Sequence, residues 1–195
     1  MEYNILPLFS SPLFNTRIDV KNRPSWDSVK WASDPTRDFS EHDDILDRPE
    51  WTNIRSQIDS ALQHFFYNIM LADPDIKINV SISWLNRNEA GHKHVLHWHP
   101  NSVFSGCLYF DSHNSGIILK STDYPQIHWG RKDWNMLNSQ EWTIKPEPGL
   151  LLIWPSHVQH EVQELNVGDP TRYSLAFNTW LTGDIWRGRQ MSLKL

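Results

Sequence analysis

The spacing of apolar residues changes once along this chain, and this change constrains the fold more than any other feature. Over residues 51–71 apolar side chains recur three or four positions apart, which predicts one amphipathic helix. Asp47 and Pro49 supply start signals for this helix, and Asp73-Pro74 supplies the stop. From Ile76 the period becomes two, which predicts a strand with one buried face. The sequence therefore predicts one helix followed by a β-rich remainder.

The remainder divides into short segments of strand character separated by turn residues. In the first segment apolar residues from Ile76 to Trp84 alternate with polar ones, and the same alternation places Asn86 on the buried side. Further strands are predicted at 94–99, 103–110, 116–121, 141–145, 150–155, 158–164 and 172–181. Many short strands behind one helix predict a mainly β fold of the jelly-roll type.

The chain has 195 residues, which favours a single domain. Its expected parts are an extended N-terminal segment over 1–50, the supporting helix over 51–71 and a jelly-roll core over 76–185. Prolines are frequent in the first part, so we expect loose structure there. The acidic run 38–47 is interpreted as a solvated surface, with an acidic interaction patch as the alternative.

Charge and composition exclude several classes of function. The net charge of −5 argues against a protein that binds nucleic acid or an anionic membrane. A single cysteine, Cys107, excludes an intramolecular disulfide and is typical of a reducing compartment. The N-terminus lacks a signal-peptide pattern, and no apolar stretch approaches the length of a membrane helix. We therefore expect a cytoplasmic protein without a membrane association.

Histidines are numerous, and two clusters of them could bind a metal ion. In GHKHVLHWHP, strand alternation places His97 and His99 on one face and His94 on the other. Two imidazoles one residue apart can reach the same ion, and a later strand offers His157 and His160 as a third ligand. Taken alone, the same pattern also fits packed or surface histidines that bind no metal.

The segment RYSLAFNTW adds a candidate anion site. Alternation places Arg172 and Ser174 on one face of this strand, with Tyr173, Leu175 and Phe177 on the other. A buried arginine is costly unless it meets an anion, and its planar fork fits a carboxylate. An internal ion pair of Arg172 with an acidic residue is the alternative. Tyr109 is either a further donor to the same carboxylate or an aromatic residue of the core.

The connection over 122–140 is long for a compact domain. It carries Trp129 and Trp134 and has no clear periodicity. Loops of this length often bind substrate, so we expect a role in substrate capture. A disordered insertion is the alternative.

Three segments together resemble a known superfamily. HWHPNSVFSGCLYF, EPGLLLIWPSHVQHEV and RYSLAFNTW are similar to the Fe(II)- and 2-oxoglutarate-dependent oxygenases, in particular to the prolyl-hydroxylase-like branch found in bacteria and phages. The opening ILPLFSSPLF and the pair Trp84 and Asn86 also resemble that branch. The resemblance implies a double-stranded β-helix, the cupin-like jelly roll, as the core of one oxygenase-like domain.

The resemblance also implies a role for individual residues. His97, His99 and His160 would hold Fe(II), Arg172 and Ser174 would bind the cosubstrate 2-oxoglutarate, and O2 would be the oxidant. Tyr109 would contact the distal carboxylate of 2-oxoglutarate, and Asn86 would make a further polar contact. One position departs from the superfamily motif H-x-[D/E], because His99 stands where a carboxylate is usual. Loss of that negative charge should weaken metal binding, and Zn(II) or Ni(II) could replace Fe(II).

These features lead to three hypotheses. The first is a dioxygenase, a hydroxylase, that couples decarboxylation of 2-oxoglutarate to substrate oxidation. The second is a three-histidine, cupin-like dioxygenase without 2-oxoglutarate, and the third is a non-catalytic metal-binding jelly-roll protein. For the substrate, the sequence leaves two classes open, a small molecule and a protein side chain. A homodimer is compatible with the resemblance, but the sequence gives no interface.

Overall fold

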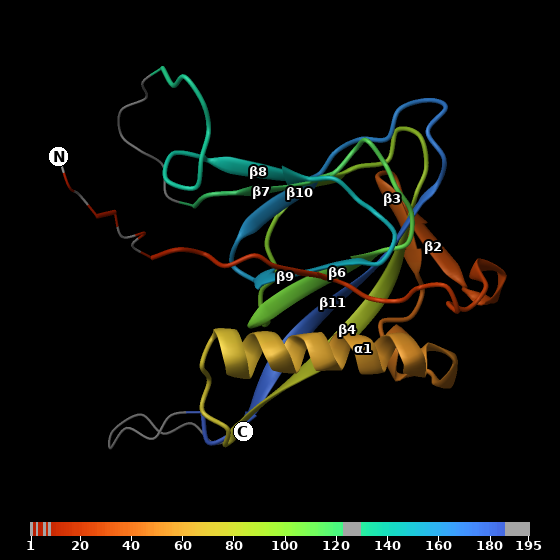
Figure 1. The fold of residues 1–195 in the computed structure, drawn as a ribbon. Helices are drawn as coiled ribbons and strands as arrows, with labels where there is room; N and C mark the ends of the chain where they lie inside the picture. Colours follow the sequence, from red (N-terminus) through yellow and green to blue (C-terminus); the bar gives the residue numbers. More distant parts are fainter. Residues whose placement is uncertain (1, 3, 6, 8, 123–129, 186–195) are drawn as a thin grey trace.

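The protein folds into two facing antiparallel sheets with one helix beneath the larger sheet (Figure 1). The computed structural model describes residues 2, 4, 5, 7, 9–122 and 130–185. Within these residues the predicted mainly β architecture with one supporting helix is confirmed. No helix of this described part combines the length and the apolar character needed to cross a membrane.

Each sheet has a defined strand order. The larger sheet contains, in spatial order, β1 (Phe14–Arg17), β9 (Leu150–Pro155), β6 (Phe104–Tyr109), β11 (Arg172–Gly183), β4 (Ile76–Asn88), β3 (Arg37–Ser40) and β2 (Trp31–Asp34). The smaller sheet contains β5 (His94–His97), β10 (Gln159–Val162), β7 (Ile117–Lys120) and β8 (Glu141–Ile144). Strands β9, β6, β11 and β4 of the larger sheet face the four strands of the smaller sheet, and this arrangement is the predicted jelly roll.

The helix covers the face of the larger sheet that points away from the smaller sheet (Figure 1). α1 (Thr52–Gln63) continues as a π-helical segment, η4 (His64–Ile69), and Trp51 ends a short preceding turn, η3 (Pro49–Trp51). Its apolar stripe is buried as far as Phe66, whereas Ile69 at its end is 49 % exposed. The buried part forms one core with the facing strands; the members include Ile54, Ile58, Leu62, Phe65, Leu85, Leu108, Leu151, Leu175 and Phe177. This apolar packing fixes β11 and leaves its other face free for the site.

Alternation along β11 separates these two faces as predicted. Leu175 and Phe177 belong to the core beneath the sheet. Arg172, Ser174 and Ala176 line a cavity between the sheets. β11 is the central strand of the larger sheet and pairs with β4 on one side and β6 on the other, so these side chains stand on a rigid element.

The uniform alternation predicted for β4 is wrong beyond Val80. The pairing with β11 shifts there, because Asn178 lies opposite Ile82 and Thr179 lies opposite Val80, leaving Ser81 as an extra residue. Ile78 packs against the helix, whereas Ile82 is 39 % exposed and Leu85 takes the core side. Asn86 is buried as predicted, but this bulge turns it toward the cavity, on the face opposite Ile78.

The expectation of loose structure over 1–50 is wrong for much of that segment. β1 pairs with β9, and the β2–β3 hairpin pairs with β4, so the segment closes both edges of the larger sheet. In the acidic run, Asp38 is buried in an ion pair with Arg87, and Ile45 and Leu46 belong to the core. The interpretation of this run as solvated surface is therefore corrected at these residues. These strands span only four residues each, too few to show a period of two.

The long connection can be followed only in part. Trp129 falls outside the described residues, so the expectation for it has no structural test. Trp134 is described and exposed. A role of this segment in substrate capture stays a prediction.

Candidate metal centre

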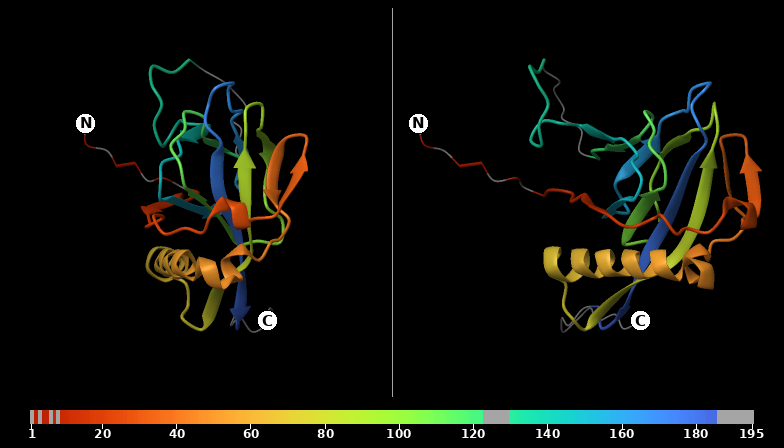
Figure 2. Two further views of the ribbon diagram at one scale, coloured as in Figure 1. Left: turned by 90° about the vertical axis from the view of Figure 1, so that its right-hand side faces the viewer. Right: turned by 45° about the vertical axis from the view of Figure 1, so that its right-hand side comes forward.

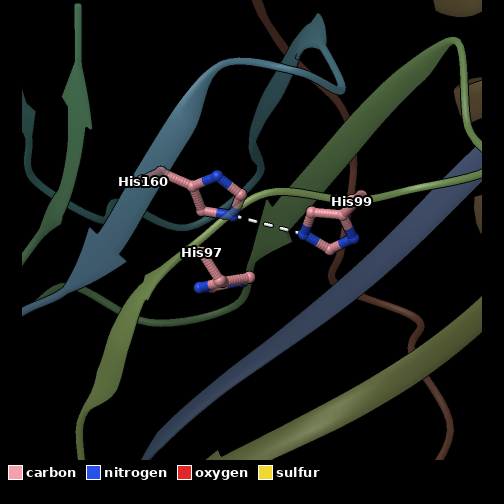
Figure 3. A group of neighbouring side chains, drawn as sticks. All are labelled: His97, His99 and His160. Atoms are coloured by element: carbon pink, nitrogen blue, oxygen red, sulfur yellow. Dashed lines mark hydrogen bonds between the residues drawn. The ribbon is translucent and has the colours of Figure 1, made fainter. Parts of the chain in front are cut away.

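Three histidines converge at one end of the space between the sheets (Figure 3). His97 ends β5, His99 follows two residues later, and His160 lies on β10 directly opposite His97. One ring nitrogen from each residue lies within 4.8 Å of the others. The Nε2 atoms of His99 and His160 are 3.3 Å apart, and their rings are stacked. The predicted group of His97, His99 and His160 is thus brought together, in a cluster whose size suits a single metal ion.

The backbone sets the orientation of two of these imidazoles. His97 donates from Nδ1 to the carbonyl oxygen of Val95 at 2.7 Å, and His160 donates from Nδ1 to the carbonyl oxygen of Val158 at 3.1 Å. A carbonyl oxygen only accepts, so Nδ1 carries the proton and Nε2 keeps its lone pair. His97 and His160 therefore present Nε2 as a neutral metal ligand.

Burial also keeps the cluster neutral. Desolvation, aided by the neighbouring imidazole of His97, lowers the pKa of His160 to about 3 and that of His99 to about 4. Desolvation likewise lowers the pKa of His97. An imidazole must be unprotonated to bind a metal, so these residues are ready to bind one at neutral pH.

The prediction that His94 faces away from His97 is wrong. The pairing of β5 with β10 shifts, because His97 lies opposite His160 while His94 lies opposite Val162. His94 therefore lines the same cavity as His97, and the intervening Val95 is 65 % exposed. His157, the alternative third ligand, is exposed and does not line the cavity.

Arg172 occupies the other end of the cavity with only 1 % of its surface exposed. Its Nη1 donates to the carbonyl oxygen of Ser115 at 3.1 Å, and its Nη2 is buried without a partner in the described part of the chain. No described carboxylate forms an ion pair with it, so the internal pair considered from the sequence is not observed. Burial lowers the pKa of Arg172. This guanidinium is suited to bind an anion from outside.

The cavity between these two ends has a volume of about 160 Å³. All seven residues predicted for the site line it: Asn86, His97, His99, Tyr109, His160, Arg172 and Ser174. Ser174 lies opposite Asn86 on one side and opposite Tyr109 on the other, so these three form a row across the sheet. None of the described residues that line the cavity is acidic.

Sequence reasoning missed several residues of the cavity wall. Trp84 stacks on His99, and Trp154 meets His160 edge-on, so both shield the cluster from water. Asn88 continues the alternation from Asn86 and could have been found that way. Arg37 comes from a hairpin whose sequence carries no such signal.

Buried polar atoms without partners show that this cavity fits a polar ligand. Five such atoms belong to described residues that line the cavity: Asn86 Oδ1, Asn88 Nδ2, His94 Nε2, Trp154 Nε1 and Arg172 Nη2. Buried polar groups are normally hydrogen-bonded, so their common position on one cavity indicates an absent partner. Neutral imidazoles at one end fit a metal ion, and a guanidinium with no counter-anion at the other end fits the carboxylate of a bound acid.

Comparisons with known proteins agree with this geometry. Residues 82–178, which carry all seven predicted site residues, match the family model described as "Putative 2OG-Fe(II) oxygenase". No protein among the curated sequences is detectably similar to the chain.

Solved structures share the fold at low sequence identity. An oxidoreductase of the 2OG-Fe(II) oxygenase family from Burkholderia pseudomallei has 14 % identity and a TM-score of 0.55, over 78 % of this chain and 72 % of that one. A prolyl-4-hydroxylase from Pseudomonas putida has 14 % identity and a TM-score of 0.52, over 78 % of each chain. HygX from Streptomyces hygroscopicus, solved with nickel, 2-oxoglutarate and hygromycin B, has 10 % identity and a TM-score of 0.59, over 87 % and 82 %. These likenesses support the double-stranded β-helix fold. The family match assigns residues 82–178, the segment that carries the whole candidate site, to the 2OG-Fe(II) oxygenase family.

Proposed function

We propose that this protein is a dioxygenase that uses Fe(II), 2-oxoglutarate and O2 to hydroxylate a substrate, with decarboxylation of 2-oxoglutarate as the coupled reaction. One observation carries the proposal. A single buried cavity has three converging imidazoles at one end and an arginine without a counter-anion at the other. 2-Oxoglutarate has a metal-chelating end and a distal carboxylate, so it matches both ends.

His97, His99 and His160 would hold the metal through Nε2 or its equivalent ring nitrogen. The bound metal supplies the redox chemistry with O2, and the protein supplies orientation and a dry site. Trp84 and Trp154 cover the imidazoles from two sides, which limits the access of water. Three neutral imidazoles do not neutralise the positive charge of the ion. The affinity for a divalent metal should therefore be lower than that of a site with two histidines and one carboxylate.

Arg172 would receive the distal carboxylate of 2-oxoglutarate at its free Nη2. Ser174 and Tyr109, one row along the sheet, would add hydroxyl donors. The hydrogen bond from Arg172 to Ser115 already holds the guanidinium in place, so little conformational entropy is lost on binding.

A cupin-like dioxygenase that does not use 2-oxoglutarate is the second candidate. The three-histidine cluster favours it, because no described acidic residue joins the histidines. In this second candidate Arg172 would be a buried charge without a binding partner, and such a charge destabilises the folded protein. A non-catalytic jelly-roll protein is disfavoured for the same reason, since it needs Arg172 to be paired internally.

Calorimetric titration of the Ni(II)-loaded protein tests the proposal. We expect 2-oxoglutarate to bind, and the Arg172→Gln variant to bind it at least ~10-fold more weakly, because a charge-assisted hydrogen bond is lost. Pyruvate has the same chelating end without the distal carboxylate, so its affinity should not change in this variant. Arg17→Gln, which removes an exposed arginine of β1, is the matched control. Equal affinity of the wild type and Arg172→Gln for 2-oxoglutarate would overturn the assignment.

A further inference from the structure

The β2–β3 hairpin brings a second guanidinium to the cavity. This hairpin stands beside β4 at the edge of the larger sheet (Figure 2, orange). Its turn is joined to the start of β5, because Lys93 donates its backbone N–H to the carbonyl oxygen of Thr36 at 3.0 Å. The neighbours of these two residues, Arg37 and His94, both line the cavity.

Local contacts hold the side chain of Arg37 in a defined position. Its Nε lies 3.4 Å from Asp34 Oδ2, and its guanidinium lies over the ring of Phe39. The other carboxylate oxygen, Asp34 Oδ1, already accepts hydrogen bonds from Thr36 and from the backbone N–H of Arg37. The side chain of Arg37 is 33 % exposed, whereas Arg172 is buried. Arg37 therefore marks the open side of the cavity, and Arg172 marks its interior.

Asn88 lies between the two arginines in the register of the sheet. It pairs with Arg172 on β11, and the pairing of Phe39 with Asn86 places Arg37 next to Asn88 on the other side. Its Nδ2 atom is buried without a partner in the described part of the chain, and so is Nε2 of His94. Since buried polar groups are normally hydrogen-bonded, these two atoms indicate a ligand group beside Arg37.

The charges of the cavity favour a second anion beside 2-oxoglutarate. Its described lining contains two guanidinium groups and no acidic residue, and Asp34, outside this lining, forms an ion pair with Arg37 at 3.4 Å. A divalent metal adds two positive charges, and 2-oxoglutarate together with Asp34 neutralises three of the resulting four. Arg172 with Ser174 and Tyr109 suffices for the distal carboxylate, so the remaining positive charge can be balanced by a second anion.

We propose that Arg37, Asn88 and His94 form a second oxyanion subsite, which binds a carboxylate or phosphate group of the primary substrate. This inference rests on the proposed function, since it assigns Arg172 to the cosubstrate. The subsite is next to the metal cluster, because the ring centroids of His94 and His97 are 6.4 Å apart. A substrate anchored there by its anionic group would place a nearby carbon beside the metal. Arg37 would act as a specificity residue for acidic or phosphorylated substrates.

Inorganic phosphate is a suitable probe of this subsite. We expect one saturable phosphate site in the Ni(II)-loaded, 2-oxoglutarate-saturated protein, measured by calorimetry at constant ionic strength. Arg37→Gln and Asn88→Leu should each weaken phosphate binding roughly tenfold, because each removes a donor to an oxyanion. Arg37→Gln should retain the wild-type affinity for 2-oxoglutarate. Lys93→Gln, which removes an exposed cation next to His94, is the control and should bind phosphate like the wild type.

Other outcomes overturn the proposal in distinguishable ways. Equal phosphate binding by the wild type and Arg37→Gln would mean an adventitious ion only, or phosphate on the metal. Weaker 2-oxoglutarate binding by Arg37→Gln, without a phosphate site in the saturated protein, would assign the subsite to the cosubstrate. If the wild type binds no 2-oxoglutarate at all, the proposed function fails. In that case phosphate titration of the metal-free protein tests the subsite separately. The subsite is supported if Arg37→Gln and Asn88→Leu weaken phosphate binding, and it is refuted if they do not.

Discussion

The two ends of the cavity are built differently. The arginine end rests on β11, the central strand of the larger sheet, whose other face is packed against the helix. The histidine end rests on β5 and β10 of the smaller sheet and on the residues just after β5. There the ring orientations depend on single hydrogen bonds to carbonyl oxygens two residues away. The arginine end is therefore fixed by packing of the core, and the histidine end by local geometry.

This difference implies that metal binding and acid binding can be separated by mutation. Substitutions at the histidine end should lower the metal affinity with little effect on folding stability, because the smaller sheet contributes less to the main core. Substitutions at the arginine end should change both cosubstrate affinity and stability, since Arg172 is a buried charge. The predictions below test this separation, from the largest expected effect to the smallest.

The largest effect is expected from the loss of a metal ligand. His160→Ala should lower the affinity for Fe(II) or Zn(II) at least ~100-fold, because only two imidazoles then remain. Competition with a chromophoric chelator measures this affinity. His157→Ala is the matched control, since His157 is exposed and lies three positions away on the same segment. Equal metal affinity of the two variants would contradict the assigned cluster.

Acid should destabilise the metal-free protein through the buried histidines. Burial lowers the pKa of His94 and His160 to about 3 and that of His99 to about 4, whereas an unfolded histidine titrates near 6.5. Between these values the unfolded state binds more protons, so stability falls as the pH decreases below about 6.5. At pH 5 the loss is about 2 kcal/mol for each histidine that stays neutral in the folded state.

Urea unfolding of the metal-free protein at several pH values checks this loss. His160→Gln should show a smaller decrease between pH 7 and pH 5 than the wild type, because one of the titrating groups is gone. A free energy of unfolding that does not change over this range would be inconsistent with buried neutral imidazoles.

A smaller effect of opposite sign is expected at the arginine end. Arg172→Met should stabilise the ligand-free protein by about 1 kcal/mol, since it removes a buried charge that has no counter-anion. The lost hydrogen bond to Ser115 limits this gain. The same variant should bind 2-oxoglutarate at least ~10-fold more weakly when the metal is present. Thermal or urea unfolding measures the change, and a clear loss of stability would indicate that Arg172 has a structural role instead.

Sequence reasoning succeeded where local periodicity determines the structure. The helix and the strands from β4 onward lie close to the predicted ranges. The helix and β11, whose apolar residues pack in the core on one face, follow the predicted periodicity most clearly. The row of Arg172 and Ser174 faces the cavity for the same reason. All seven predicted site residues line this one cavity, and their roles as ligands stay predictions.

Errors arose where pairing partners determine the structure. The extra residue at Ser81 turns Asn86 to the cavity, and the shift between β5 and β10 turns His94 inward. Neither change is visible in one strand alone, because a bulge is defined by the strand opposite. Arg37 reaches the cavity only because its short hairpin pairs with the edge of β4. The sequence of β3 is too short to predict that pairing.

An anaerobic titration of the Fe(II)-loaded protein with 2-oxoglutarate tests the central claim most directly, that one cavity binds a metal and an oxo acid together. Chelation of the oxo acid at open metal positions produces a weak visible charge-transfer band. We predict a saturable band in the wild type and in His157→Ala, no band in His160→Ala, and a titration midpoint at least ~10-fold higher in Arg172→Gln. Stoichiometric iron binding without any band in the wild type would contradict this account.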